Sequence, residues 1–263
     1  MSPAAGGKRG KARAKNYWDR EIAQRSEGLI IGRGDYSPAY NRWLYQSKER
    51  ALTRLLKKQG VTAAGARVLD VGSGLGYWAE WYLARGAASV IGIDYSLESV
   101  QRLAEAFPDG TWLHADITKN IGLRGQFDIV SVMDVMYHIA SDEDFERGLS
   151  NVSGRVRPGG VMIVTDRLNR REQHATGRGC WRGRSDYEPA LNEAGLDIVE
   201  VRPITMLMNG GLHDVIAHPR RILSRPVSIL EERTAPLLYA LDSATMLSRL
   251  ANLQIMLARR RDT

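Results

Sequence analysis

The sequence lacks the features that mark secreted, membrane-spanning or disulfide-linked proteins. Its 263 residues include one cysteine, Cys180, so an internal disulfide and a zinc site built from several cysteines are both excluded. No run of about 18 apolar residues occurs, and we therefore expect no membrane-spanning helix. The first 15 residues are basic but lack the apolar block of a signal peptide. These absences favour a cytoplasmic protein.

Two common nucleotide-binding patterns are also missing. Glycines gather at Gly72, Gly74 and Gly76, directly after an apolar stretch. The Gly-x-Gly-x-x-Gly pattern of dinucleotide-binding folds would need its third glycine where this chain has Tyr77, and no Gly-Lys-Ser/Thr follows to make a P-loop. The spacing disfavours NAD and indicates a ligand that meets the backbone through groups other than phosphates.

The net charge of +7 comes from the two ends of the chain. Residues 1–15 contain five basic and no acidic residues, and residues 259–262 contain three arginines and one aspartate. The sequence between them is neutral overall. We therefore expect two basic, disordered tails rather than a broad nucleic-acid-binding surface.

Short apolar runs alternate with helix-like segments, which predicts an α/β fold with a doubly wound, mainly parallel sheet of seven strands. The strands are predicted at 67–71, 89–93, 111–114, 127–133, 161–165, 196–203 and 252–258, and helices are predicted to begin near Tyr77, Leu97, Ser141 and Ser185. We divide the chain into a basic tail (1–15), an N-terminal helical cover (16–60) and a core (61–263), with a helical insertion (204–251) before the last strand.

Five motifs at the ends of successive predicted strands resemble those of class I S-adenosylmethionine-dependent methyltransferases. The motifs are VLDVGSGLG (68–76), GIDYS (92–96), HADIT (114–118), FDIVSVMDVMYHI (127–139) and RVRPGGVMIVTD (155–166), the last containing an expected turn, RPGG, into strand five. The resemblance covers 68–166 and implies a Rossmann-like methyltransferase fold with S-adenosyl-L-methionine as cofactor.

The resemblance also implies a cofactor site. The glycine loop would face the amino-acid end of the cofactor, Asp94 the ribose hydroxyls and Asp116 the adenine amino group. The full set of implied cofactor-binding residues is Asp70, Gly72, Ser73, Gly74, Gly76, Asp94, Tyr95, Asp116, Ile117 and Met133. Independently, the carboxyl ends of parallel strands are where open α/β sheets bind ligands. The competing interpretation is that the acids cap helices and the glycines only form tight turns.

His138 is the main catalytic candidate. It follows strand four, and a histidine accepts protons near neutral pH. Asp134 would orient it or act as a base itself, while His174 is a weaker candidate. The alternative is that His138 simply packs against its neighbours. Asp134 and Asp166 also follow adjacent strands, as metal-binding carboxylates do in catechol-type methyltransferases, but Arg167 stands where that family has Asn. We expect no metal.

Missing motifs argue against several classes of methyl acceptor. The chain has no Asn/Asp-Pro-Pro-Tyr after strand four, no cysteine nucleophile there and no double-glutamate loop, which argues against amino-purine, cytosine-C5 and protein-arginine methylation. We expect a small, partly apolar metabolite or natural product, with oxygen favoured over nitrogen as the acceptor atom. The alternatives are an RNA or other nucleic-acid methyltransferase and a non-catalytic cofactor-binding partner protein.

Two segments after the five motifs indicate what the protein could bind. The apolar side chains of the 204–251 insertion would roof an acceptor pocket or, equally, form a homodimer face. The arginine-rich segment 167–184 has three interpretations: a clamp for an acceptor carboxylate or phosphate, a track for a nucleic-acid backbone, or a solvated loop. We expect no contact with nucleic acid or membrane.

Overall fold

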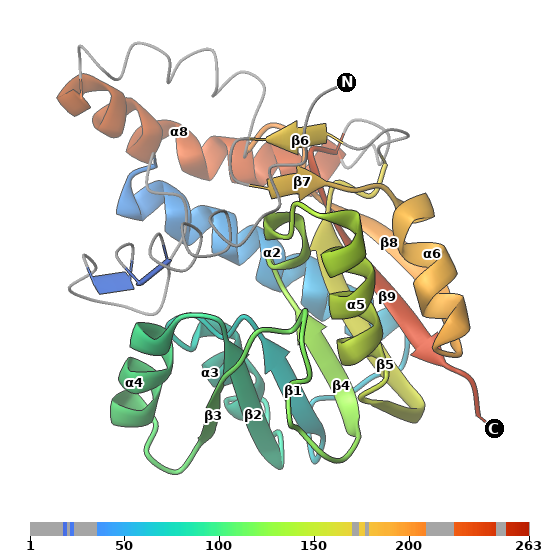
Figure 1. Cartoon of the computed structure of the whole chain (residues 1–263). Coiled ribbons are helices and arrows are strands. Elements are labelled where there is room, and N and C mark those ends of the chain that lie inside the picture. The colour runs from blue at the N-terminus through green and yellow to red at the C-terminus, as the bar shows by residue number, and fades with distance from the viewer. Residues whose placement is uncertain are drawn as a thin grey trace, which may run out of the picture.

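Figure 1 shows the computed structural model, a twisted sheet flanked by helices. The structure describes residues 18–19, 22–23, 36–169, 174–176, 179–208, 224–245 and 251–262. Its elements are α2 (Pro38–Lys58), β1 (Arg67–Val71), α3 (Tyr77–Leu83), β2 (Ser89–Asp94), α4 (Leu97–Ala106), β3 (Thr111–His114), β4 (Phe127–Val132), the 3₁₀ helix η1 (Met136–His138), α5 (Asp142–Ser153), β5 (Val156–Asp166), β6 (His174–Thr176), β7 (Gly179–Trp181), α6 (Arg184–Glu193), β8 (Leu196–Thr205), α8 (Ser224–Thr245) and β9 (Leu253–Arg260).

The main sheet has seven strands in the order β3-β2-β1-β4-β5-β9-β8. Strands β1 to β5 pair in parallel, and β9 runs antiparallel between β5 and β8. The strand order reverses between β1 and β4, so the loops after these two strands diverge there and leave a place for a ligand. The predicted fold class is confirmed.

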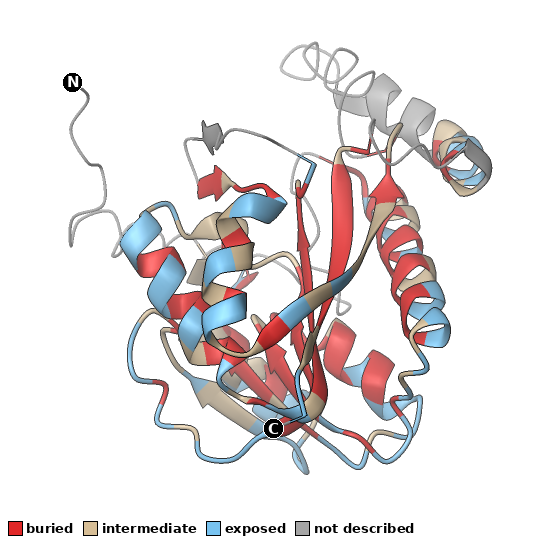
Figure 2. Ribbon diagram, turned by 90° about the vertical axis from the view of Figure 1, so that its right-hand side faces the viewer, coloured by how far each residue is buried: buried red, intermediate tan, exposed pale blue. Residues whose placement is uncertain are grey.

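The side chains of each central strand alternate between two cores because successive residues of a strand point to opposite faces. In β1, Val68 joins the core beneath α2 and α3, whereas Leu69 and Val71 join the core beneath α5 and α6. Figure 2 shows the buried strands between these helical layers. The near-continuous apolar character of the strands follows from burial on both faces.

Strand β5 differs from its prediction. It begins at Val156 rather than at residue 161, so the expected RPGG turn lies inside the strand. Phe127 pairs with Val156 and Ile129 pairs with Val161, which makes the segment between them a bulge. Gly159 has φ +68°, a conformation that an L side chain rarely adopts, and this lets the strand bulge without ending.

The C-terminal arginines were predicted to lie in a disordered tail, and this was wrong. Arg259 and Arg260 belong to β9, where Arg259 pairs with Val161 of β5. The Arg260 guanidinium donates to the Val156 carbonyl at 2.6 Å. Their charged ends hydrogen-bond to carbonyls near the sheet end, so a basic run here is compatible with a strand.

The arginine-rich segment contains an antiparallel pair of short strands, β6 and β7, where a loop was expected. Helix α8 falls within the region expected to be a helical insertion. Residues 1–15, part of the N-terminal cover and much of the insertion lie outside the described residues. Among the described residues, no helix is both long enough and apolar enough to span a bilayer.

Candidate active site

The glycine loop follows β1 at the carboxyl ends of the central strands, here called the carboxyl edge. The backbone N–H groups of Gly72 and Ser73 donate to the Ile93 carbonyl at 2.7 and 3.1 Å. Gly72 has φ +72°, and a Cβ added to it would lie 2.3 Å from the Val135 side chain. This position therefore requires glycine both for its conformation and for the close approach of Val135, in the loop after β4.

Asp94, at the end of β2, organises this loop. Its carboxylate accepts a hydrogen bond from the Gly74 N–H at 2.8 Å and another from the Ser96 N–H at 2.8 Å. Burial raises the pKa of Asp94, while these N–H donors oppose the shift. A carboxylate oxygen can accept more than one hydrogen bond, so both can still receive ligand hydroxyls.

Asp70 is a buried acid that forms no ion pair with the residues that the structure describes. Only 1% of the residue is exposed, and neither carboxylate oxygen has a hydrogen-bond partner among the described residues. Burial, with a smaller contribution from the negative charge of Asp94, raises the pKa of Asp70 to about 8. A buried acid of this kind fits a ligand that brings a cation or hydrogen-bond donors.

The other implied cofactor residues lie at the same edge. Asp116 follows β3, and one of its oxygens accepts from the Thr118 N–H at 3.0 Å, so it also has the local turn-forming role of the alternative interpretation. Its pKa is lowered by the Thr118 and Lys119 contacts, which outweigh the opposing effect of burial. The remaining residues are buried Ile117 and Met133, half-buried Tyr95, and buried Gly76 at the start of α3.

Asp134 lies just beyond β4 in an unusual conformation. Its φ of +63° is the only positive φ of a non-glycine residue in the described parts of the chain. The Thr165 hydroxyl accepts from the Asp134 N–H at 2.7 Å and donates to its carboxylate at 3.0 Å. The other carboxylate oxygen forms an ion pair with Lys48 of α2. The structure thus shows Lys48 and Thr165, rather than His138, as contacts of this carboxylate.

His138 ends η1 at the same edge. Its ring lies edge-on to Trp18, with centroids 4.8 Å apart, and 4.3 Å from the Tyr137 ring. Tyr137 in turn stacks on Trp181 of β7 at 4.1 Å. All four residues are half-buried, so His138 lies in an aromatic, partly accessible environment. His174 is on β6.

Asp166 has a structural environment that does not match the metal alternative. It is fully buried. Its carboxylate accepts hydrogen bonds from the Tyr187 hydroxyl at 2.6 Å and from the Arg167 N–H at 2.7 Å. Burial raises its pKa to about 7. Asp134 and Asp166 therefore have separate partners, and no cluster of three metal-ligating side chains occurs within the described residues.

Arg182 was a candidate for an acceptor clamp, but its side chain is buried. The guanidinium donates to the Ile139 carbonyl at 2.7 Å, the Ala140 carbonyl at 3.3 Å and the Asp142 carboxylate at 2.8 Å. It thereby holds β7 against the loop that follows His138. Arg184 lies on the surface and pairs with Glu188, while Arg170 and Arg171 are outside the described residues.

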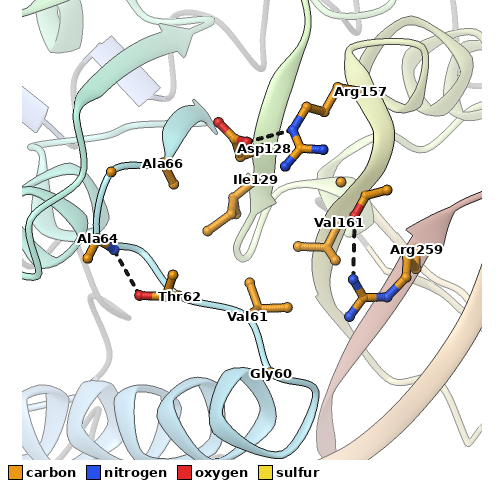
Figure 3. Close-up of a pocket in the computed structure, with 13 residues that line it drawn as sticks. Gly60, Val61, Thr62, Ala64, Ala66, Asp128, Ile129, Arg157, Val161 and Arg259 are labelled. Carbon is orange, nitrogen blue, oxygen red and sulfur yellow. Dashed lines mark hydrogen bonds and ion pairs between the residues drawn. The ribbon is translucent and has the colours of Figure 1, made fainter. Parts of the chain in front are cut away.

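A cavity of about 320 Å³ lies at the opposite, amino end of the strands. Figure 3 shows Val61, Ile129 and Val161 around it, with Arg157 and Arg259 at its side. Arg157 donates to Asp128 at 2.6 Å, and Arg259 donates to the Gly159 and Gln59 carbonyls. The charged groups at this cavity are satisfied by the protein itself, unlike Asp70.

Comparison with known proteins identifies the family. Residues 40–201 match the family profile described as a methyltransferase domain. The chain belongs to this methyltransferase family. The methyltransferase is 43% identical to the tRNA U34 carboxymethyltransferase of Methylococcus capsulatus over 106 residues. This aligned region covers 38% of this chain and 32% of that protein. The chain is 27% identical over 183 residues to phosphoethanolamine N-methyltransferase 1 of Triticum aestivum, covering 64% of this chain and 34% of that protein.

The methyltransferase thus spans about a third of the length of these curated relatives. Among solved structures, the magnesium protoporphyrin IX methyltransferase of Synechocystis PCC 6803, with bound S-adenosylmethionine, has a TM-score of 0.60 and 17% identity, covering 98% of this chain and 100% of that one. At this identity the likeness concerns the fold. The family resemblance drawn from the five motifs is confirmed.

The residues of this methyltransferase fit the family's cofactor, S-adenosylmethionine. The unpartnered Asp70 carboxyl suits a group that brings positive charge or donors, and the side-chain-free backbone at Gly72 and Gly74 allows close approach. Asp94 offers a carboxylate to hydroxyl donors beside that backbone. Charge-assisted hydrogen bonds of this kind are among the stronger polar contacts.

Sequence reasoning missed Lys48 and Thr165. A signal for Lys48 existed, because the buried residues Leu44, Lys48, Leu52 and Leu55 of α2 recur every three or four positions. A lysine within such an apolar stripe needs a partner in the folded protein. The identity of that partner could not be inferred, because Asp134 is 86 residues away in the sequence.

Proposed function

We propose that this protein transfers the methyl group of S-adenosylmethionine to a small, partly apolar metabolite, with an oxygen acceptor favoured over nitrogen. One observation carries the proposal: Asp70, Asp94 and the glycine loop share the carboxyl edge with Asp134 and His138. A cofactor-binding arrangement and two proton acceptors therefore flank the same strand ends.

When bound, S-adenosylmethionine supplies a methyl group on a positively charged sulfur. The protein's own task is mainly to hold an acceptor close and aligned, which can account for much of the rate enhancement. His138, or Asp134, takes the proton from the acceptor hydroxyl as the O–CH₃ bond forms and the S–CH₃ bond breaks. The aromatic side chains of Trp18, Tyr137 and Trp181 exclude water and favour a partly apolar acceptor.

A methyl-release screen tests the proposal. The protein is incubated with S-adenosylmethionine and a panel of phenols, alcohols, amines and tRNA, and formation of S-adenosylhomocysteine is followed. We expect turnover with a small hydroxyl compound. His138→Ala should lower kcat by about a hundredfold while leaving cofactor affinity unchanged, with the loss shrinking at high pH. A cofactor-binding protein that turns over no acceptor would support the non-catalytic alternative.

RNA methylation is the second candidate, and the similarity to a tRNA-modifying enzyme favours it. The sequence between the basic ends is neutral overall, which favours a small acceptor instead. Salt dependence separates the two. If basic residues contact the phosphate backbone of RNA, binding to tRNA should weaken steeply with ionic strength, and deleting residues 1–15 should flatten this slope. A small acceptor predicts a shallow slope that is indifferent to the deletion.

A further inference from the structure

Lys48 occupies an unusual place for a lysine. It lies on the buried side of α2, and only 6% of its side chain is exposed. Its ammonium contacts the Asp134 carboxylate and lies 4.5 Å from the centre of the Tyr45 ring. Burying an ion pair costs desolvation that the attraction between the charges often does no more than offset. Stability alone is therefore a weak reason for this pair.

Its partner Asp134 is held in place at some energetic cost. A left-handed conformation at a non-glycine residue is energetically unfavourable and persists only where surrounding contacts enforce it. Here those contacts come from the fully buried Thr165, which bonds both the Asp134 N–H and its carboxylate, and from Lys48. The carboxylate is therefore fixed from two sides.

The pair also lies beside the glycine loop. Val135, the residue after Asp134, packs closely on Gly72: a Cβ added to Gly72 would lie 2.3 Å from the Val135 side chain. The Asp134 side chain is 19% exposed and that of Lys48 is 6% exposed. The aspartate side chain is thus the more accessible member of the pair.

We propose that Lys48 is a positioning residue, which holds the Asp134 carboxylate beside the reacting centre so that the charges of the pair act on the sulfonium of the bound cofactor. The inference rests on the proposed function, because it places the reacting centre at the carboxyl edge. Since Lys48 belongs to α2, the orientation of the Asp134 carboxylate depends on the packing of this helix on the sheet. An acceptor that donates a hydrogen bond to Asp134 would meet a carboxylate already fixed in place.

The test compares two ligands that differ in charge. S-adenosylmethionine carries a positive sulfur, whereas S-adenosylhomocysteine has a neutral one and otherwise lacks only the methyl group. Calorimetry gives the dissociation constants of both for the wild type, Lys48→Met, Lys48→Arg, Asp134→Asn and the double variant Lys48→Met/Asp134→Asn. Lys57→Met, which changes an exposed lysine of the same helix, is the matched control.

We expect the affinity ratio of the two ligands to follow the local charge. Lys48→Met leaves the Asp134 charge uncompensated and should shift the ratio about threefold to tenfold towards S-adenosylmethionine. Asp134→Asn leaves the Lys48 charge and should shift it a similar amount the other way. The double variant, Lys48→Arg and Lys57→Met should all keep the wild-type ratio. Each single charge deletion tests the inference on its own, because the two are expected to shift the ratio in opposite directions, so the other still serves if one of them unfolds the protein.

A purely structural role makes a different prediction. If the pair only fastens α2, both affinities should change together and the ratio should stay constant in every variant, which would overturn the inference. A preserved ratio together with acceptor turnover would refute the role of Lys48 but leave the proposed function intact. The converse result, a charge-dependent ratio without turnover, would refute the proposed function alone.

Discussion

Asp128 and Asp70, at opposite ends of the central strands, have opposite environments. At the amino end, Asp128 accepts from the Arg67 N–H at 2.7 Å and from Arg157 at 2.6 Å, and these contacts lower its pKa despite the opposing effect of burial. At the carboxyl end, Asp70 has no hydrogen-bond partner among the described residues, and its pKa is raised to about 8.

At the amino end the protein itself supplies the hydrogen-bond partners of the charged groups, whereas at the carboxyl end Asp70 is left for a ligand to bond. The amino end has the cavity of Figure 3, but its charged groups are bonded to the protein. The carboxyl end has Asp70, whose buried carboxylate has no hydrogen-bond partner in the described part of the chain, and Asp134, which has a left-handed conformation. Unsatisfied polar groups and backbone strain are therefore better guides to function here than the size of a cavity.

The largest contrast is expected between Asp94 and Asp128. Asp94→Ala removes a charged acceptor of ligand hydroxyls and two hydrogen bonds that shape the glycine loop, so affinity for S-adenosylhomocysteine should fall about a hundredfold or more. Asp128→Ala, at the amino end, should leave it unchanged. Calorimetry on both folded variants measures the contrast, and equal affinities would remove Asp94 from the cofactor site.

Two glycines provide a matched pair for stability. Gly72 and Gly65 have nearly the same φ, +72° and +75°, so alanine is strained at both. A Cβ at Gly65 would meet nothing within 4 Å, whereas one at Gly72 would lie 2.3 Å from Val135. Gly72→Ala should therefore destabilise the protein by about 1–3 kcal/mol more than Gly65→Ala. Urea unfolding measures this difference, and equal losses would mean that Val135 moves aside without cost.

Asp70 should make stability depend on pH. With its pKa raised from 3.8 to about 8, the native state keeps a proton that the unfolded state releases above about pH 4. The free energy of unfolding without ligand should therefore fall as the pH rises towards 8, by up to about 1.4 kcal/mol per pH unit. Asp70→Asn should reduce this slope. Part of it will remain, because the pKa of Asp166 is also raised, to about 7. An unchanged slope would show that Asp70 does not titrate in this range.

The smallest effect is expected at the amino end. Arg157→Met removes an ion pair in which the arginine side chain is 50% exposed, and such pairs contribute roughly 0–1 kcal/mol. Cofactor affinity should not change. A marked loss of affinity would mean that the cavity of Figure 3 takes part in cofactor binding.

The sequence allowed the strand positions and the cofactor motifs to be predicted, because buried parallel strands are continuous apolar runs and the glycine loop has a fixed place after the first of them. It did not allow the Lys48–Asp134 pair to be predicted, since that contact depends on how α2 packs on the sheet. Arg182 was misjudged for a related reason: within a run of arginines, nothing local distinguishes the buried side chain from the solvated ones.

The most direct test maps S-adenosylhomocysteine onto the backbone. In a titration of the ¹⁵N-labelled protein, followed by two-dimensional NMR, the amide signals that change most should be those of residues 72–76, 94–96, 116–117 and 133–135, at the carboxyl edge. Signals of residues 60–66 and 157–161, around the amino-end cavity, should stay in place. The reverse pattern, with the largest changes around that cavity, would contradict a cofactor site at the carboxyl edge.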